Sequence, residues 1–292
     1  MLIYTLMVYK SQKAASLYSE FANSKNLKEA KIMPGTFNGT TLTISATPVD
    51  GALIPDKSAT NVAGIAIVGS DMYCVKTTGL KTTLLKTTDY MATKATAVKK
   101  DLNWFALGLT KIGNYLYMLA EDHKGYGGST TIVKLDTKGN QLGTYSINEI
   151  CPKGALGITA ADGTNEKFII MHYADKSNAG TLAFSVVDWK AAEAASTFTV
   201  TNSGYDYSAL YSILSNEFQL QDIYYHTSFG LFILTNNTFS TLQNRILVVD
   251  YHLTDDKGKK YTPCSVINVN KTGEYKQYNL ESICMKANHL VL

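Results

Sequence analysis

Residues 62–69 of the chain read VAGIAIVG, and residues 72–75 read MYCV. A related phrase follows 44 residues later without a gap, with GL at 108–109, G at 113 and LYML at 116–119. Similarity at a fixed period is typical of repeated supersecondary units. The repeat therefore indicates that the chain contains several copies of one structural unit.

Each of these two units contains four short apolar runs separated by turn residues, which is the pattern of short β-strands. In the second unit, residues 136–140 (DTKGN) combine Asp, Gly and Asn, the residues that favour tight turns. The predicted strands are 62–68, 72–76, 81–87 and 93–99 in the first unit, and 106–112, 115–120, 129–135 and 141–147 in the second.

Three further units follow. Residues 116–136 align without a gap to residues 168–188, so that Leu119 matches Met171 and Asp136 matches Asp188. The third unit opens at 155–158, the fourth has apolar runs at 220–223, 230–234 and 245–250, and the fifth has them at 280–283 and 289–292.

One position recurs in all five units and sets their spacing. Units of 40 to 50 residues with four strands each are typical of β-propeller blades. The intervals are 44, 49, 65 and 60 residues, and the longer ones need only inserted loops, one of them a tyrosine-containing stretch at about 201–218 that has room for a short helix. The equivalent residues are Gly64, Gly108, Gly157, Asp222 and Ser282.

These units predict an all-β fold, a single β-propeller domain over residues 1–292 with five four-stranded blades that start near 62, 106, 155, 220 and 280. Because the fifth unit ends after two strands, residues 1–50 are expected to complete the blade begun at about 280, which removes an exposed sheet edge. Residues 11–25 fit a helix or two strands. Residues 37–47 predict part of a hairpin, which leaves six blades as an alternative.

The repeat resembles a generic bacterial β-propeller repeat. The resemblance rests on the paired short strands, the glycine near the start of the inner strand and the ending IVKLDTKGN at 132–140, and it covers about residues 62–292. There is no Trp-Asp ending of the WD40 kind and no kelch double glycine. The resemblance implies a blade and no particular activity.

Composition narrows the classes of function. Hydrophobic residues make up 45% and charged residues 17%, which fits a compact globular protein. The net charge is +3, carried by 26 lysines and one arginine, Arg245. Because nucleic-acid readers rely on arginine for bidentate contacts, this balance argues against a nucleic-acid partner.

Neither the cysteines nor the apolar start of the chain indicates a special site. The four cysteines, at 74, 151, 264 and 284, have no metal-ligand or disulfide-framework spacing. Residues 1–9 are apolar but too short for a transmembrane helix, and they predict a strand. No transmembrane segment is expected. The compartment stays open, with an extracellular or cell-surface location favoured.

Ligand sites of propellers usually form at one end, from loops between the second and third strands and between blades, which is an argument by fold analogy. Aromatic side chains beside amides and carboxylates suit sugar rings. The predicted ligand-binding residues are Trp104, Asp122, His123, Tyr126, His172, Tyr173, Asp175, Tyr205 and Tyr207. The alternative is that these are ordinary loop residues, with Trp104 packed between blades.

Two carboxylates, Asp222 and Glu281, fall at the starts of neighbouring inner strands. A glycoside-cleaving enzyme needs two carboxyl groups about 5 to 9 Å apart, so this is the pair to test if the chain is an enzyme. The sequence has no nucleophile elbow, no P-loop and no dinucleotide fingerprint. No metal or cofactor is predicted.

The sequence thus favours a non-enzymatic propeller that recognises a glycan or a protein partner through aromatic and polar loops. A glycoside hydrolase or lyase with channel carboxylates is one alternative, and a structural module of a larger surface or phage assembly is another.

Overall fold

The computed structural model describes residues 5–6, 41–46, 61–87, 95–122, 129–151, 154–160, 167–173, 182–195, 218–226, 230–237, 244–250, 262–271, 280–286 and 289–291. Within these ranges the chain forms strands β1 to β19 and one short helix, α2 (Trp189–Ala195). The predicted all-β class is confirmed. The element considered for residues 11–25 lies outside the described residues, and so does the stretch considered at about 201–218, except for Phe218, which begins β14.

The two units recognised first form two four-stranded antiparallel sheets with the same strand order. The first sheet contains β3 (Asn61–Val68), β4 (Asp71–Thr78), β5 (Lys81–Thr87) and β6 (Thr96–Leu102). The second contains β7 (Phe105–Ile112), β8 (Tyr115–Glu121), β9 (Thr130–Leu135) and β10 (Gln141–Ser146). Apart from β6, which lies a few residues later than expected, these strands follow the predicted ranges closely.

The remaining strands form three more sheets among the described residues. The third sheet contains β11 (Ala155–Ala160), β12 (Lys167–Tyr173) and β13 (Leu182–Asp188). The fourth contains β14 (Phe218–His226), β15 (Gly230–Asn237), β16 (Asn244–Asp250), β17 (Thr262–Lys271) and β2 (Thr41–Ala46). The last contains β18 (Cys284–Lys286), β19 (His289–Val291) and β1 (Thr5–Leu6).

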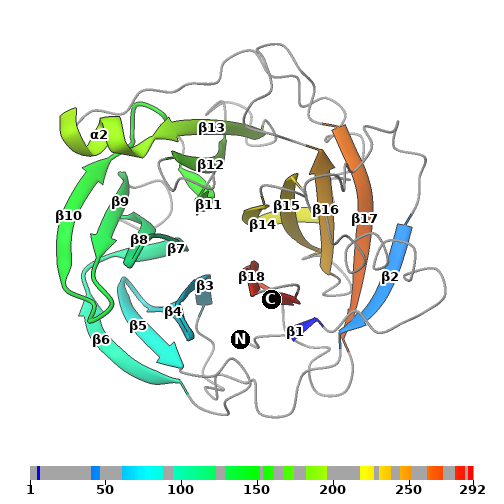
Figure 1. Cartoon of the computed structure of the whole chain (residues 1–292), viewed down its shortest axis with the longest axis horizontal. Helices are drawn as coiled ribbons and strands as arrows, with labels where there is room; N and C mark the ends of the chain where they lie inside the picture. Colours follow the sequence, from blue (N-terminus) through cyan, green and yellow to red (C-terminus); the bar gives the residue numbers. More distant parts are fainter. Residues whose placement is uncertain are drawn as a thin grey trace.

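The sheets are arranged around a common centre (Figure 1). The first strand of each sheet lies nearest that centre and contacts the first strand of the next: β3 contacts β7, β7 contacts β11, β11 contacts β14, and β14 contacts β18. β18 in turn contacts β3. Small antiparallel sheets packed radially in this way are the architecture of a β-propeller.

Apolar side chains fill the seams, meaning the interfaces between neighbouring sheets. One buried cluster joins the first two sheets and includes Tyr73 and Leu109. A second joins the second and third sheets, where Trp189 of α2 packs edge-on against Tyr117 with ring centroids 4.9 Å apart. Helix α2, which the sequence did not predict, thus places an aromatic anchor in this seam.

The N-terminal segment is divided between two sheets. β1 pairs with β19, so Thr5 lies opposite Val291 in the last sheet. β2 instead runs parallel to β17 at the outer side of the fourth sheet, with Leu42 opposite Ile267. The prediction that the whole of residues 1–50 completes the last blade is therefore wrong for β2. Residues 280–283, predicted as strand, precede β18 and are not part of it.

A β-bulge marks the recurring position in four of the five units. The register shifts between Val62 and Ile65 in β3, between Ala106 and Gly108 in β7, between Ala155 and Gly157 in β11, and between Leu220 and Asp222 in β14. Bulges bend a strand and increase its twist. The repeated glycine signal in the sequence therefore corresponds to a bend in each of these inner strands.

At or near the recurring position, a polar side chain crosses each seam and accepts a hydrogen bond from a backbone N–H group of the next sheet. These side chains give backbone N–H groups at the seams an acceptor. The pairs are Thr77 and Thr82 with Ala106 N, Thr110 with Ala160 N, Thr159 with Tyr225 N, Asp222 with Ile283 N, and Ser282 with Gly64 N.

The seam hydrogen bonds lead to a first prediction. Thr159→Val keeps the side-chain shape but leaves the Tyr225 N–H without its acceptor, so the free energy of unfolding should fall by about 1–3 kcal/mol. Thr96→Val is the control, because the exposed Thr96 hydroxyl donates only to the Lys86 carbonyl, at 3.3 Å. Its effect should stay within about 0.5 kcal/mol in urea denaturation. Equal effects of the two substitutions would contradict the role of the seam bond.

Candidate functional site

The inner strands of neighbouring sheets run in the same direction. Thr110 on β7 accepts a hydrogen bond from the backbone N–H of Ala160 on β11 at 3.0 Å. Two residues earlier on β7, a Cβ added at Gly108 would lie 3.4 Å from Ile158 and 3.8 Å from Gly157 Cα. The contacts advance together along both strands, so β7 and β11 are codirectional.

β11 and β14 are codirectional by the same reasoning. Gly157 lies against Asp222, and Thr159 accepts a hydrogen bond from the N–H of Tyr225 at 3.1 Å. The second strands β8, β12 and β15 are antiparallel to β7, β11 and β14. They therefore all finish at one end of the ring, called the loop end below, where the segments 122–129, 174–181 and 238–243 begin.

The opposite end is formed by tight turns in the first two sheets. There β3 and β4 are joined by the two-residue turn Gly69–Ser70, and β7 and β8 by Gly113–Asn114. Gly69 and Gly113 have φ values of 62° and 58°, in the left-handed region that glycine adopts without strain. In the second sheet, the longer connection lies at the loop end.

Two predicted ligand-binding residues lie inside the packing. Trp104 is half-buried against the cluster between the first two sheets, and its indole N–H donates to Gln141 Oε1 at 3.1 Å. His172 is part of β12 and not of a loop, and it is buried with Nε2 2.8 Å from Ser185 Oγ. Both positions match the structural alternative more closely than a ligand-facing surface.

The other predicted ligand-binding residues lie at or beyond the strand ends. Asp122 is half-buried at the base of the first long segment, where its backbone N–H donates to the Ser129 carbonyl at 3.2 Å. Tyr173 is the last residue of β12. The described residues do not include His123, Tyr126, Asp175, Tyr205 and Tyr207.

Asp222 lies at the seam between the fourth and last sheets, with 2% of its surface exposed. Its Oδ1 accepts from the Ile223 N–H at 2.9 Å, and its Oδ2 accepts from the Ile283 N–H at 3.2 Å. Burial raises the pKa of this carboxyl well above its usual value, against the lowering effect of the two N–H groups, and the charge of Glu281 raises it further.

Glu281 is half-buried and stands one residue before the recurring position. In the other four units, the residue that precedes the recurring position is also half-buried. The residue at the recurring position itself is buried in all five units. The set is apolar in the first three units and polar in the last two: Ala63, Leu107, Leu156, Gln221 and Glu281. The two predicted acids are close enough for the charge of Glu281 to raise the pKa of Asp222. They differ in environment, because Asp222 is buried and Glu281 is half-buried.

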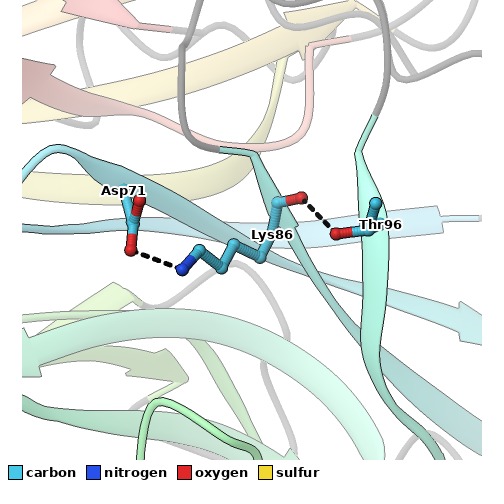
Figure 2. Close-up of polar contacts among 3 residues, drawn as sticks. All are labelled: Asp71, Lys86 and Thr96. Atoms are coloured by element: carbon cyan, nitrogen blue, oxygen red, sulfur yellow. Dashed lines mark hydrogen bonds and ion pairs between the residues drawn. The ribbon is translucent and has the colours of Figure 1, made fainter.

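Two neighbouring sheets carry a lysine over a tyrosine at matching positions. Lys86 Nζ lies 5.8 Å from the Tyr73 ring centroid, and Lys134 Nζ lies 6.0 Å from that of Tyr117. In the first sheet Lys86 also pairs with Asp71 at 2.6 Å, while its carbonyl accepts from Thr96 (Figure 2). The hydrogen bond from Lys86 to Asp71 is the main cause of the raised pKa of this lysine.

In the second sheet, Lys134 pairs with Glu193 of α2. The aromatic ring of Tyr115, which is 44% exposed, also lies under this lysine at 4.5 Å. The contacts of Lys134 with Glu193 and Tyr115 thus lie where α2 packs against the seam between the second and third sheets. The spacing of Tyr73 and Tyr117, 44 residues, matches the repeat, so the sequence contained the signal for the pair.

The seam acceptors are the residues that sequence reasoning missed. Two of them could have been recognised, because the repeated glycine is followed two residues later by threonine, as Gly108–Thr110 and Gly157–Thr159. Ser282 and Asp222 occupy the recurring position itself, and their partners are set by packing.

Neither a metal centre nor a membrane span is found in the part of the chain that the structure describes. Among those residues, no group of three or more His, Cys, Asp and Glu side chains is placed to hold a metal ion. No helix of the described ranges is long and apolar enough to cross a membrane. Cys74, Cys151 and Cys284 are buried as free thiols, and burial raises the pKa of Cys74 to about 12.

Several solved structures resemble this one. Glutaminyl cyclase from Myxococcus xanthus is 13% identical over 85% of this chain and 89% of its own, with a TM-score of 0.49. BamB from Moraxella catarrhalis is 12% identical over 79% of this chain and 84% of its own, with a TM-score of 0.36. The Dos1 propeller is 12% identical over 80% of this chain and 65% of its own, with a TM-score of 0.36.

The sequence matches no protein-family model and no curated protein. The structural likenesses are too distant to transfer an activity or a ligand to this chain. What the strand pairing and the radial packing establish is the fold: the chain is an all-β protein of β-propeller architecture.

Proposed function

We propose that this chain is a non-enzymatic binding protein, a five-bladed propeller that recognises a glycan or a protein partner at its loop end. The observation that carries the proposal is the common direction of β8, β12 and β15, which starts three connecting segments of neighbouring sheets at one end. Propellers gather ligand contacts from such loops because the loops vary freely while the blades hold them in place.

The count of five blades is part of this proposal. The five inner strands contact one another in sequence, and β18 returns to β3. Pairing of β1 with β19 adds a strand from the beginning of the chain to the sheet that contains its end. In this arrangement the last blade is closed by both ends of the chain, as the sequence predicted for its first strand.

The composition of the connecting segments favours a carbohydrate as the ligand. Asp122, His123 and Tyr126 lie in the first segment, and Asp175 lies in the second. Tyrosine rings stack on the CH-rich faces of sugars, while carboxylates accept hydrogen bonds from hydroxyl groups. A protein partner is the other outcome that the same surface allows.

The glycosidase alternative is less favoured by the described residues. Both oxygens of Asp222 accept hydrogen bonds from backbone N–H groups, and the side chain is buried. A carboxyl group held in this way has a structural role in the seam, and Glu281 alone does not make a pair of catalytic acids.

The test compares Tyr126, which belongs to the segment between β8 and β9, with Tyr115 at the tight-turn end. Tyr126→Ala should reduce binding on a glycan array about five- to thirtyfold, since stacking on one aromatic ring contributes about 1–2 kcal/mol. Tyr115→Ala, at the tight-turn end, removes an exposed aromatic of the same size and should leave binding unchanged.

The same two variants are used as bait in pull-downs. A protein partner that binds the loop end should be captured by Tyr115→Ala and not by Tyr126→Ala. Two results would reject the loop end as the binding site. The first is an equal loss of binding in Tyr126→Ala and Tyr115→Ala. The second is unchanged binding in both of these variants and also in Tyr205→Ala and Tyr207→Ala.

A further inference from the structure

The fourth sheet has five strands, one more than each of the four-stranded first and second sheets. β2 lies at its outer side and pairs with β17 in register over six residues, from Thr41 opposite Val266 to Ala46 opposite Lys271. This pairing is parallel, whereas every other strand pair among the described residues is antiparallel. β2 is therefore an addition to a complete four-stranded sheet and not one of its repeating strands.

The attachment of β2 involves one neighbour. Among the described elements, β17 is the one that β2 contacts substantially, and Figure 1 shows the two strands side by side at the periphery. Main-chain hydrogen bonds along one edge are a sufficient means of joining an extended segment to a sheet. Without β2, the outer edge of β17 would present unpaired N–H and C=O groups.

Long stretches of sequence separate β2 from its neighbours along the chain. Residues 7–40 separate it from β1, and residues 47–60 separate it from β3. A β2 strand from another copy would make the same six-residue register with β17, so exchange between copies would keep this pairing.

We propose that the outer edge of β17 is a strand-accepting surface, which is filled either by β2 of the same chain or by β2 of a second copy, giving a strand-exchanged dimer. The pairing of β2 with β17 is the same in the monomer and in the dimer. Because exchange joins two copies, the dimer forms at high protein concentration. The interface is separate from the loop end, so the dimer and the ligand site are independent.

Disulfide mapping tests the exchange. Thr43 and Asn268 are register partners, and neighbouring strands about 4.8 Å apart are within disulfide reach. One copy carries Thr43→Cys with an affinity tag, and an untagged copy carries Asn268→Cys. Both carry Cys264→Ser, because Cys264 also lies on β17. After mixing, dilution and mild oxidation, a mixed disulfide-linked dimer is expected, and its yield should rise with protein concentration.

A chain carrying both Thr43→Cys and Asn268→Cys should form the bond within one copy at low concentration. The control pair is Thr43→Cys with Ser265→Cys, which is three residues out of register and should not cross-link. An intrachain bond at every concentration with no mixed dimer would overturn the proposal. Absence of both products in protein with an unchanged thermal melt would overturn it as well.

A peptide competition tests the edge itself. Alternate residues of a strand direct their N–H groups to the partner, so Thr43→Pro combined with Ile44→Pro removes one ladder donor whichever set faces β17. A labelled peptide of residues 38–49 should bind this full-length variant about tenfold or more tightly than the parent, whose edge is occupied. Thr43→Val with Ile44→Val keeps the strand and should behave as the parent.

Failure of the peptide to bind the folded proline variant, or equal binding of a scrambled peptide, would show that the edge does not accept a strand. If the proline variant loses its fold, the cysteine mapping still decides, because it leaves the β2 backbone intact. Neither readout involves the loop end, so failure of this proposal and failure of the proposed ligand site are distinguishable.

Discussion

Gly64→Ala is expected to lower the free energy of unfolding by more than about 3 kcal/mol. Gly64 has φ of 122°, which L-residues rarely adopt, so any side chain is strained there. A Cβ at this position would lie 2.1 Å from Leu109 N and 2.6 Å from Gly108 C. Both are backbone atoms of β7, so β3 and β7 would have to separate at the seam. The shift would also disturb the hydrogen bond from Gly64 N to Ser282.

Urea denaturation followed by circular dichroism measures this loss. Gly113→Ala is the matched control, since Gly113 also has positive φ but a Cβ there meets nothing within 4 Å. Its cost should be the conformational one alone, about 1–2 kcal/mol. If Gly64→Ala costs no more than Gly113→Ala, the close approach of β3 and β7 is not present in solution.

The recurring glycines differ in how much space surrounds them. A Cβ at Gly108 would be in ordinary contact with Ile158 at 3.4 Å, whereas one at Gly157 would lie 3.0 Å from Asp222 Oδ1 and 3.2 Å from Asp222 Cα. Gly108→Val should therefore be less harmful than any side chain at Gly64.

The second large effect is expected at Asp222. Asp222→Leu leaves the N–H groups of Ile223 and Ile283 without their acceptor, so the free energy of unfolding should fall by more than about 2 kcal/mol. The loss opens the seam that joins the last sheet to the fourth. Proteolysis near the C-terminus should become faster in this variant if the last sheet detaches first.

Asp222 also gives stability a particular dependence on pH. Its folded-state pKa is raised above the ordinary value of 3.8, so folding favours the protonated carboxyl. The stability that this provides is fully present below pH 3.8 and is lost as the pH rises through the folded-state pKa. Relative to Asp222→Asn, which does not titrate, the parent should become less stable as the pH increases.

Asp136 supplies a control of opposite sign. Slight burial acts to raise its pKa, but hydrogen bonds from Asn140 and from the N–H of Lys138 outweigh it, so the pKa is lowered. Relative to Asp136→Asn, the parent should lose stability as the pH falls through the folded-state pKa of Asp136. Urea titrations between pH 3 and 8 measure both slopes, and equal signs for the two residues would contradict the assignment for Asp222. Glu281→Gln should weaken the Asp222 slope, because the charge of Glu281 contributes to it.

Local patterns accounted for much of the fold. Alternating apolar residues and turn glycines predicted the strands of the first two sheets to within a few residues, because strand period and turn chemistry are properties of short segments. The helix α2 was missed, since its seven residues give too short a pattern to recognise. β2 was placed in the wrong sheet because the packing of the whole chain decides which sheet edge takes a further strand, and a local pattern does not contain that information.

The candidate site was less predictable than the fold. His172 was expected on a loop, but the strand continues to Tyr173 and buries the imidazole beside Ser185. Trp104 was expected to contact a ligand, but it packs between two sheets. Burial depends on what the rest of the chain places over a residue, and no local pattern contains that information.

By itself, the sequence determined that the chain is a repeated all-β protein, and it marked the recurring position in every unit. Only the tertiary structure decided what that position does: Gly64 allows two inner strands to approach, Asp222 joins two sheets, and Ser282 accepts the N–H of a residue 218 positions away. The physical reason is that a buried backbone donor must find an acceptor, and which side chain reaches it is fixed by the packing of neighbouring sheets.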